Sequence, residues 1–219
     1  MRDIGKILDG MIDTMNTVKP PRITALRALR EAENRNPLSI LIGTILSART
    51  RDENTSAVVK KLFSRYKTAH ALAGAKISDV EKIIKSTGFY HVKARRIIEV
   101  ASIIDSKYSG KVPQTLDMLV ELPGVGRKTA NCVLVYAFDK PAIPVDTHVH
   151  RISNRLGLVK TKKPEDTEIE LMKKIPKEQW IRINDTFVMY GQNICKPVSP
   201  MCDVCKIKKE CAYYKTISS

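Results

Sequence analysis

Apolar residues recur every three or four positions over almost the whole length of this chain, the spacing that places them on one face of an α-helix. Ile97, Ala101, Ile104 and Tyr108 follow this spacing, and so do the apolar residues of segment 58–66. No convincing stretch alternates apolar and polar residues as a half-buried β-strand does. The sequence therefore predicts an all-α fold, with about ten helices joined by short connections.

Helix-start signals agree with this prediction. Asn36 stands directly before Pro37, a favourable first residue of a helix, and Thr115 stands before an apolar segment. Ser78 and Glu81 have the spacing of a capping box, in which the two side chains satisfy N–H groups at the helix start. We therefore expect helices to begin after Asn36, Ser78 and Thr115.

Prolines mark two breaks in the helical pattern, because proline cannot continue a helix. One break is the segment KPPR at 19–22, and the other is DKPAIPVDTH at 139–148. Between them lies a helical block from about residue 23 to about residue 138. The two breaks are therefore candidate domain boundaries.

The chain carries 38 Lys and Arg residues against 23 Asp and Glu residues, a formal net charge of +15. This excess indicates a polyanionic partner such as nucleic acid, with a lysine-rich surface of the thermophile type as the alternative. No apolar run approaches the roughly 18 residues of a membrane span, and charged residues recur throughout the N-terminal segment. We therefore expect no targeting signal, no membrane anchor and a cytoplasmic location.

Two glycines interrupt the helical pattern in the segment ELPGVGRKTANCV, residues 121–133. A triphosphate-binding loop needs a wider glycine spacing and a preceding β-strand, and this segment has neither. The remaining interpretation is a helix at about 116–122, a hairpin PGVGR and a helix at about 128–138. Gly124 and Gly126 allow the backbone to approach a phosphate, toward which the second helix points its first N–H groups. A plain αα-corner with a glycine cap is the alternative.

Four cysteines near the C-terminus have the spacing C-x6-C-x2-C-x5-C: Cys195, Cys202, Cys205 and Cys211. A chain without an export signal rarely forms a disulfide framework, so this cluster indicates a metal site. Four thiolates in so short a segment suit a [4Fe-4S] cluster, whereas zinc usually has two C-x2-C pairs with a longer spacer. A tetrahedral zinc site stays open as the alternative. We expect the fifth cysteine, Cys132, in the core.

The segment LPGVGRKTA resembles the helix-hairpin-helix of the endonuclease III family of DNA glycosylase/AP lyases. Other segments resemble that family in the same chain order, namely LSART at 46–50, GFYHVKA at 88–94 and VDTHVHRISNR at 145–155. The cysteine spacing is similar to the family's cluster motif. The resemblance runs from about residue 37 to about residue 213.

The resemblance implies two helical domains with a DNA-binding groove between them. The first is residues 23–138, which carries the helix-hairpin-helix at about 116–138. The second is an iron-sulfur cluster domain made of residues 1–22 and 139–219.

By the same resemblance, Lys128 is the amine nucleophile and Asp146 is its carboxylate partner. Lys128 also stands at the start of the expected helix beside Arg127, and both features disfavour a protonated amine. Asp146 has the position of a helix N-cap, which is its alternative role. The implied reaction removes an oxidised pyrimidine through a lysine Schiff base and then nicks the strand by β-elimination.

The resemblance further implies which residues contact DNA. The hairpin residues that would bind the sugar-phosphate backbone are Gly124, Val125, Gly126 and Arg127. Arg49 and Phe89 stand at two loop tips that would fill the gap left by an extruded base; their alternatives are a phosphate contact and a core position, respectively. In the loop after the first cysteine, where the family presents basic residues to DNA, this chain has only Lys196.

Two other functions stay open at this point. A monofunctional thymine- or adenine-mismatch glycosylase of the same superfamily is similar in hairpin and cluster but lacks a lysine at the position of Lys128. A non-catalytic DNA-binding iron-sulfur protein would have no reason to keep Lys128 together with Asp146. The expected partner is double-stranded DNA containing damaged bases or abasic sites, bound by a monomer associated with the nucleoid of a prokaryote.

Overall fold

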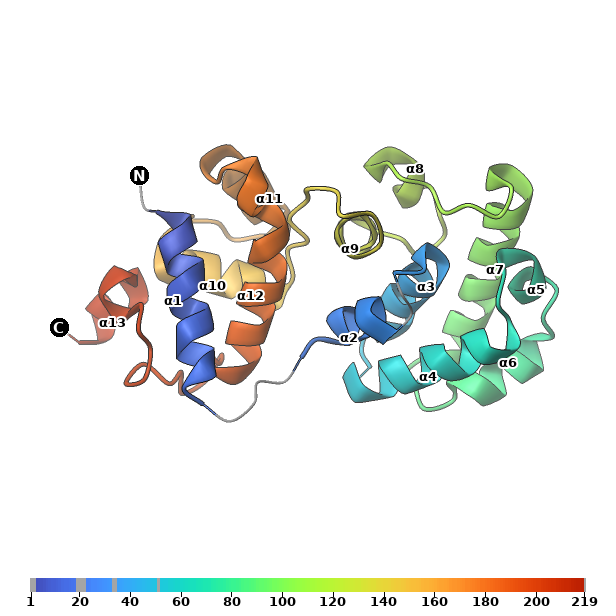
Figure 1. The fold of residues 1–219 in the computed structure, drawn as a ribbon, viewed down its shortest axis with the longest axis horizontal. Helices are drawn as coiled ribbons and strands as arrows, with labels where there is room; N and C mark the ends of the chain where they lie inside the picture. The colour runs from blue at the N-terminus through green and yellow to red at the C-terminus, as the bar shows by residue number, and fades with distance from the viewer. Residues whose placement is uncertain (1–2, 19–22, 33–34, 51, 219) are drawn as a thin grey trace. The chain divides into compact units, whose positions relative to one another are not determined.

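The computed structural model describes residues 3–18, 23–32, 35–50 and 52–218 of the chain (Figure 1). These residues form thirteen α-helices and two short 3-10 helices and contain no β-strand, so the predicted all-α fold is confirmed. The count exceeds the predicted one because several short segments form separate helices, among them α5 (Ala69–Ala73), α8 (Leu116–Val120) and α13 (Ala212–Ile217).

The chain divides into two compact units. One unit is Ala25–Lys140, and the other combines Met1–Thr24 with Pro141–Ser219. The segment KPPR, which the sequence marks as the first break, lies outside the described residues. Around the second break, residues 139–146 are not helical, and here the chain passes from one unit to the other.

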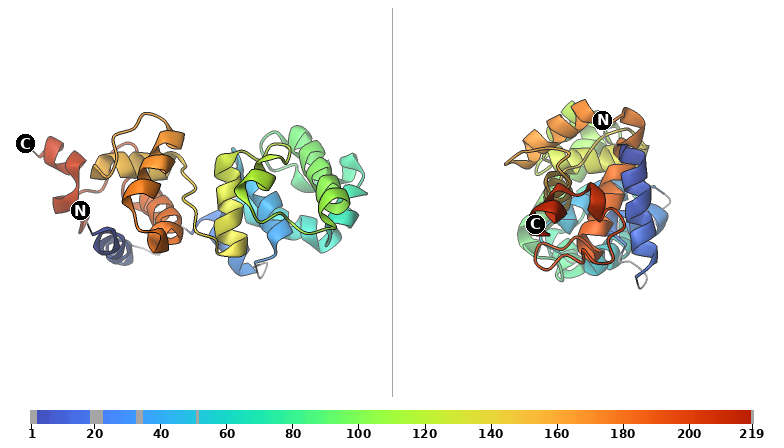
Figure 2. Two further views of the ribbon diagram at one scale, coloured as in Figure 1. Left: turned by 90° about the horizontal axis from the view of Figure 1, so that it is seen from above. Right: turned by 90° about the vertical axis from the view of Figure 1, so that its left-hand side faces the viewer.

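The helix α3 (Pro37–Ser47) forms the centre of the unit Ala25–Lys140. Its residues from Leu38 to Leu46 are all buried, as expected for a helix that is apolar on every side. Asn36 caps α3, because its side-chain oxygen accepts hydrogen bonds from the N–H groups of Leu38 and Ser39. Four helices pack against α3 (Figures 1 and 2): α2 (Ala25–Ala32), α4 (Asp52–Arg65), α7 (Tyr90–Tyr108) and α9 (Arg127–Phe138).

Shorter helices support α7 and α9 in the same unit. α5 and α6 (Ile77–Ile84) pack against α7, and α8 packs against α9. Thr115 caps α8 by accepting a hydrogen bond from the N–H of Met118, as predicted. The capping box predicted at Ser78 and Glu81 is wrong, because the N-cap of α6 is Lys76, two residues before Ser78, and its side chain makes no capping bond.

The helices α1 (Ile4–Asn16), α10 (Thr147–Leu156) and α12 (Trp180–Asn193) surround the core of the other unit. α12 packs against both α1 and α10, and α11 (Pro164–Lys174) packs against α10. Leu8, Met11 and Phe187 are fully buried there, so the N-terminal helix completes a core that the C-terminal part of the chain mainly supplies. None of the described helices is long and apolar enough to cross a membrane.

Candidate nucleic-acid interface and cysteine site

The predicted hairpin joins α8 to α9. Leu122 and Val125 are buried and anchor the hairpin, while Gly124 and Gly126 between and after them are exposed. Gly124 has a φ of 72°, in the left-handed region that glycine adopts without strain, and Gly126 is the N-cap of α9 without any side-chain cap. The hairpin therefore presents backbone, not side chains, at the positive end of α9. Val125 itself is 4% exposed, and its N–H donates a hydrogen bond to the Leu122 carbonyl oxygen at 3.0 Å, so this residue holds the hairpin in shape.

Arg127 and Lys128 are the first two residues of α9, and both are exposed. Lys128 therefore stands in the first turn of the helix after the hairpin, as the sequence predicts. Cys132, one turn further along α9, is buried as expected.

Arg96 is a basic residue beside the hairpin that the sequence analysis did not identify. It lies on α7, and a Cβ atom placed on Gly124 would come within 2.2 Å of its side chain. The half-buried Arg96 side chain therefore lies against the hairpin glycine, leaves it exposed, and adds positive charge next to it. Arg96 follows Phe89 by two helical turns, so the spacing could have indicated that the two side chains lie on the same face of α7.

The two predicted loop tips, Arg49 and Phe89, lie side by side although they are far apart in the sequence. The guanidinium carbon of Arg49 is 5.3 Å from the centroid of the Phe89 ring, a cation–π distance. Both residues have left-handed backbones, with φ of 53° and 57°. Phe89 is 62% exposed, so the alternative that this ring packs into the core is wrong.

Asp146 is the N-cap of α10. Its Oδ1 accepts hydrogen bonds from the N–H groups of His148, at 2.9 Å, and Val149, at 2.8 Å. These two bonds fix the orientation of the half-buried carboxylate. Asp146 is therefore a helix N-cap, and this role is compatible with a further role in a reaction. Asp146 belongs to the unit containing Pro141–Ser219, whereas Lys128 belongs to Ala25–Lys140.

Arg151 connects α10 to the segment that carries the first cysteine. Its guanidinium donates hydrogen bonds to the carbonyl oxygens of Gly191, at 3.1 Å, and Cys195, at 2.9 Å. A Cβ atom on Gly191 would lie only 2.6 Å from the His148 ring, so the close packing of α10 on α12 requires glycine there. The helix that Asp146 caps is therefore tied directly to the cysteine segment.

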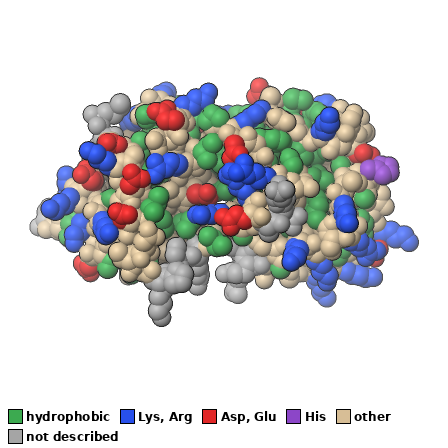
Figure 3. Space-filling view, viewed as in Figure 1, with side chains coloured by type: hydrophobic (Ala, Val, Ile, Leu, Met, Phe, Trp, Pro, Cys, Tyr) green, Lys and Arg blue, Asp and Glu red, His purple; other side chains and the backbone are tan. Residues whose placement is uncertain are grey.

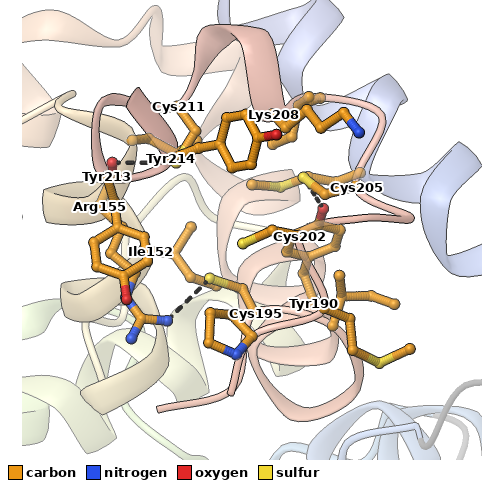
Figure 4. Close-up of a pocket in the computed structure, with 16 residues that line it drawn as sticks. Ile152, Arg155, Tyr190, Cys195, Cys202, Cys205, Lys208, Cys211, Tyr213 and Tyr214 are labelled. Atoms are coloured by element: carbon orange, nitrogen blue, oxygen red, sulfur yellow. Dashed lines mark hydrogen bonds between the residues drawn. The ribbon is translucent and has the colours of Figure 1, made fainter. Parts of the chain in front are cut away.

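The four predicted cysteines line one pocket, together with Tyr190 and Arg155 (Figure 4). The Tyr190 hydroxyl donates a hydrogen bond to the Cys205 sulfur at 2.9 Å, and Arg155 donates to the Cys195 sulfur at 3.4 Å. Burial raises the pKa of the Cys205 thiol, and it also raises the pKa of the Cys202 thiol, with a further contribution from the neighbouring cysteines. Metal binding at this site would therefore have to release thiol protons.

The donor set of this pocket bears on which metal centre it could hold. Four cysteine thiolates from one short segment line the pocket. Four thiolates are a ligand set for a tetrahedral zinc ion, and also for a [4Fe-4S] cluster, in which each thiolate binds a different iron. Hydrogen bonds to ligand sulfurs are also a feature that tunes iron-sulfur sites. The residues present fit an all-thiolate iron-sulfur cluster.

Arg155 also holds the loop between the first two cysteines. It donates hydrogen bonds to the carbonyl oxygens of Lys196, at 2.7 Å, and Pro197, at 2.8 Å. The Lys196 side chain is exposed, which is the position that its predicted role requires. The neighbouring Val198 is 81% exposed, so this loop presents one cation and an apolar tip.

Positive charge is not confined to the hairpin. α4 and α6 expose Lys60, Lys61 and Lys82, and Figure 3 shows Lys and Arg side chains gathered over these helices at the lower right. Acidic side chains are interspersed elsewhere on the visible face (Figure 3). A broad basic surface of this kind attracts a polyanion over a longer range than a single binding site does.

Comparison with known proteins identifies the class of protein to which this hairpin and this cysteine pocket belong. Residues 42–177 match the HhH-GPD superfamily of base excision DNA repair proteins. The chain is 52% identical to Endonuclease III of Thermotoga maritima over 186 residues, which cover 85% of this chain and 87% of the relative. The chain belongs to the endonuclease III family.

Two solved structures are similar to this one over nearly its full length. A trapped covalent intermediate of endonuclease III with DNA has a TM-score of 0.83 and 36% sequence identity, with all of both chains covered. A thermostable thymine-DNA glycosylase has a TM-score of 0.82 and 27% identity, covering 97% of this chain and 96% of that one. Because both structures are matched almost equally well, the fold alone does not separate the two activities.

Proposed function

We propose that this chain removes oxidised pyrimidines from double-stranded DNA and nicks the strand at the resulting abasic site. It is a DNA glycosylase with abasic-site lyase activity. The observation that carries the assignment is Lys128 in the first turn of α9, directly after a hairpin that exposes its backbone. An exposed amine beside a phosphate-binding hairpin is positioned to attack the sugar of a bound strand.

Binding begins with backbone contacts. The hairpin from Gly124 to Arg127 binds a sugar-phosphate through its exposed backbone without reading sequence, and Lys196 adds a cationic contact. The damaged base is then extruded from the stack, which costs a few kcal/mol and costs least for a poorly stacked base. A pyrimidine saturated at C5 and C6 is no longer planar and stacks poorly. Arg49 and Phe89 occupy the gap that it leaves.

The chemistry uses the two predicted catalytic residues. The Lys128 amine forms a bond to the sugar C1′ while the glycosidic bond breaks and the base departs, and the Asp146 carboxylate stabilises the positive charge that develops. The product is a Schiff base between Lys128 and the opened sugar. Loss of a proton from C2′ then expels the 3′ phosphate, and hydrolysis of the Schiff base regenerates the lysine.

Cys195, Cys202, Cys205 and Cys211 hold a [4Fe-4S] cluster in this proposal. The cluster would link Cys195, just after the end of α12, to the three cysteines of the C-terminal segment, and a metal bound only by the folded chain stabilises the fold. Tyr190 and Arg155 orient the ligand sulfurs by the hydrogen bonds described above. The proposed partner is duplex DNA with a damaged base or an abasic site, bound by a monomer in the nucleoid of a prokaryotic cell.

The similarity to a thymine-DNA glycosylase makes a monofunctional mismatch enzyme the second candidate. Lys128 separates the two, because a lysine Schiff base leads to strand cleavage and a water nucleophile does not. The test compares duplexes containing 5,6-dihydrothymine or a guanine–thymine mismatch, analysed on denaturing gels with and without alkali. We expect nicking of the dihydrothymine strand without alkali. Cleavage that appears only after alkali would identify the monofunctional enzyme instead.

A further inference from the structure

Lys93 is a buried lysine in the second turn of α7 that the proposed chemistry does not use. Only 5% of the residue is exposed. Its ammonium group donates three hydrogen bonds: to the carbonyl oxygens of Leu46, at 2.8 Å, and Ala48, at 2.7 Å, and to the Thr50 hydroxyl, at 2.9 Å. An ammonium group has three N–H donors, so each of them has a partner.

Two of the three acceptors, on Ala48 and Thr50, directly flank Arg49 in the chain, and the third, on Leu46, lies three residues before it. The Leu46 carbonyl is among the last four of α3, which have no N–H partner within the helix, and Ala48 is the C-cap. Charge-assisted hydrogen bonds to these groups are stronger than bonds between neutral partners. Burial lowers the pKa of Lys93 to about 8, so placing a protonated amine here carries a desolvation cost, which the three hydrogen bonds offset only in part. The contacts therefore hold the loop in the shape that gives Arg49 its left-handed backbone.

Lys93 also contacts the second loop tip, Phe89. The backbone N–H of Lys93 donates a hydrogen bond to the carbonyl oxygen of Phe89, the N-cap of α7, at 3.0 Å. A Cβ atom on Gly88 would lie 2.8 Å from the carbonyl oxygen of Arg49, so the two loops touch through their backbones as well. Lys93 thus contacts one loop through its side chain and the other through its main chain.

We propose that Lys93 is a positioning residue that fixes the Arg49 and Phe89 tips side by side before DNA binds. Both tips have left-handed backbones, which are unfavourable for non-glycine residues, so they need external support. A preformed pair of tips enters the gap beside an extruded base without first having to be ordered. This inference rests on the proposed function, because it assumes that the enzyme extrudes a base.

The test uses Lys93→Met in the full-length protein, a change that keeps the length and apolar stem of the side chain and removes all three donors. Single-turnover base excision is measured on a dihydrothymine duplex, and strand cleavage is measured separately on a duplex with a preformed abasic site. Base excision should fall about ten-fold or more, because a small misplacement of positioning groups has effects of this size. Cleavage of the abasic site, which has no base to extrude, should stay close to wild type and shows that the variant is folded.

Two further variants test whether the effect of Lys93→Met comes from the lost charge alone and whether it acts through the loop tips. Lys111→Met removes the same charge from an exposed position and should leave both rates unchanged. In a background carrying Arg49→Ala and Phe89→Ala, Lys93→Met should cause no further loss of excision, because residues that act through one another are not additive. The inference would be overturned if Lys93→Met reduced both reactions equally or left excision unchanged. It would also be overturned if Lys93→Met caused its full loss of excision in the protein that already carries Arg49→Ala and Phe89→Ala. Wild-type protein that neither excises the base nor cleaves the abasic site would instead refute the proposed function.

Discussion

Substitutions of Asp146 should affect the stability of the protein and the rate of the reaction to different extents. Its Oδ1 accepts two backbone hydrogen bonds at the start of α10, at 2.9 and 2.8 Å, and the proposed reaction uses its negative charge. Asn keeps an oxygen that accepts the same two bonds and lacks the charge, whereas Ala lacks both. The pair of variants Asp146→Asn and Asp146→Ala therefore distinguishes the N-cap from the catalytic role.

The expected magnitudes follow from these contacts. Asn and Asp are nearly equivalent N-caps, so Asp146→Asn should change stability by no more than about 0.5 kcal/mol. Asp146→Ala leaves two N–H groups without their acceptor and should cost about 1 kcal/mol, which corresponds to a fall in Tm of about 2–4 °C in a chain of this size. Both variants should lose base excision by about two orders of magnitude or more, because both lack the charge that stabilises the transition state.

Thermal unfolding followed by circular dichroism measures the first effect, and single-turnover excision on a dihydrothymine duplex measures the second. Binding to duplex DNA, measured in parallel, should be nearly unchanged in both variants. If Asp146→Asn excises the base at a rate comparable to wild type, Asp146 is a helix cap and has no part in the reaction. If Asp146→Asn destabilises the protein as much as Asp146→Ala, the hydrogen-bond argument is wrong.

Three other predictions concern the cofactor, the binding energy and the loop tips. Protein prepared anaerobically should be yellow-brown and contain about four irons per chain; stoichiometric zinc without iron would exclude the cluster. The logarithm of the DNA-binding constant should fall with the logarithm of salt concentration with a slope of roughly −3 to −6, and a salt-independent constant would exclude binding through phosphates. Lesions opposite guanine should be processed several-fold faster than the same lesions opposite adenine, because Arg49 offers only donors and matches the guanine acceptors. Arg49→Gln should remove this difference, and equal wild-type rates would leave Arg49 as a phosphate contact.

The features that could be predicted from the sequence are those that neighbouring residues determine. A glycine pair between two helical segments defines the hairpin at Gly124 and Gly126, and Asn36 and Thr115 cap helices as expected. The four cysteines meet in one pocket because they lie within one short segment. Ser78 shows the limit of such local signals, since α6 begins at Ile77, before the pattern that predicts its start.

The features that the sequence did not reveal depend on contacts between distant segments. Nothing near Lys93 shows that this lysine is buried or that its acceptors follow α3. Arg96 lies against Gly124 only because α7 passes beside the hairpin. The sequence left the position of the Phe89 ring open, and its exposure follows from the left-handed backbone that places it at the start of α7.

The proposed reaction requires Lys128 to form a covalent Schiff base with the sugar of damaged DNA. Sodium borohydride reduces a Schiff base to a stable amine, so the most direct measurement is the yield of cross-linked protein and DNA on a dihydrothymine duplex. Wild-type protein and the control Lys111→Gln should give the cross-linked species, and Lys128→Gln should give none. Trapping by Lys128→Gln at the wild-type rate would contradict the account, because another group would then be the nucleophile.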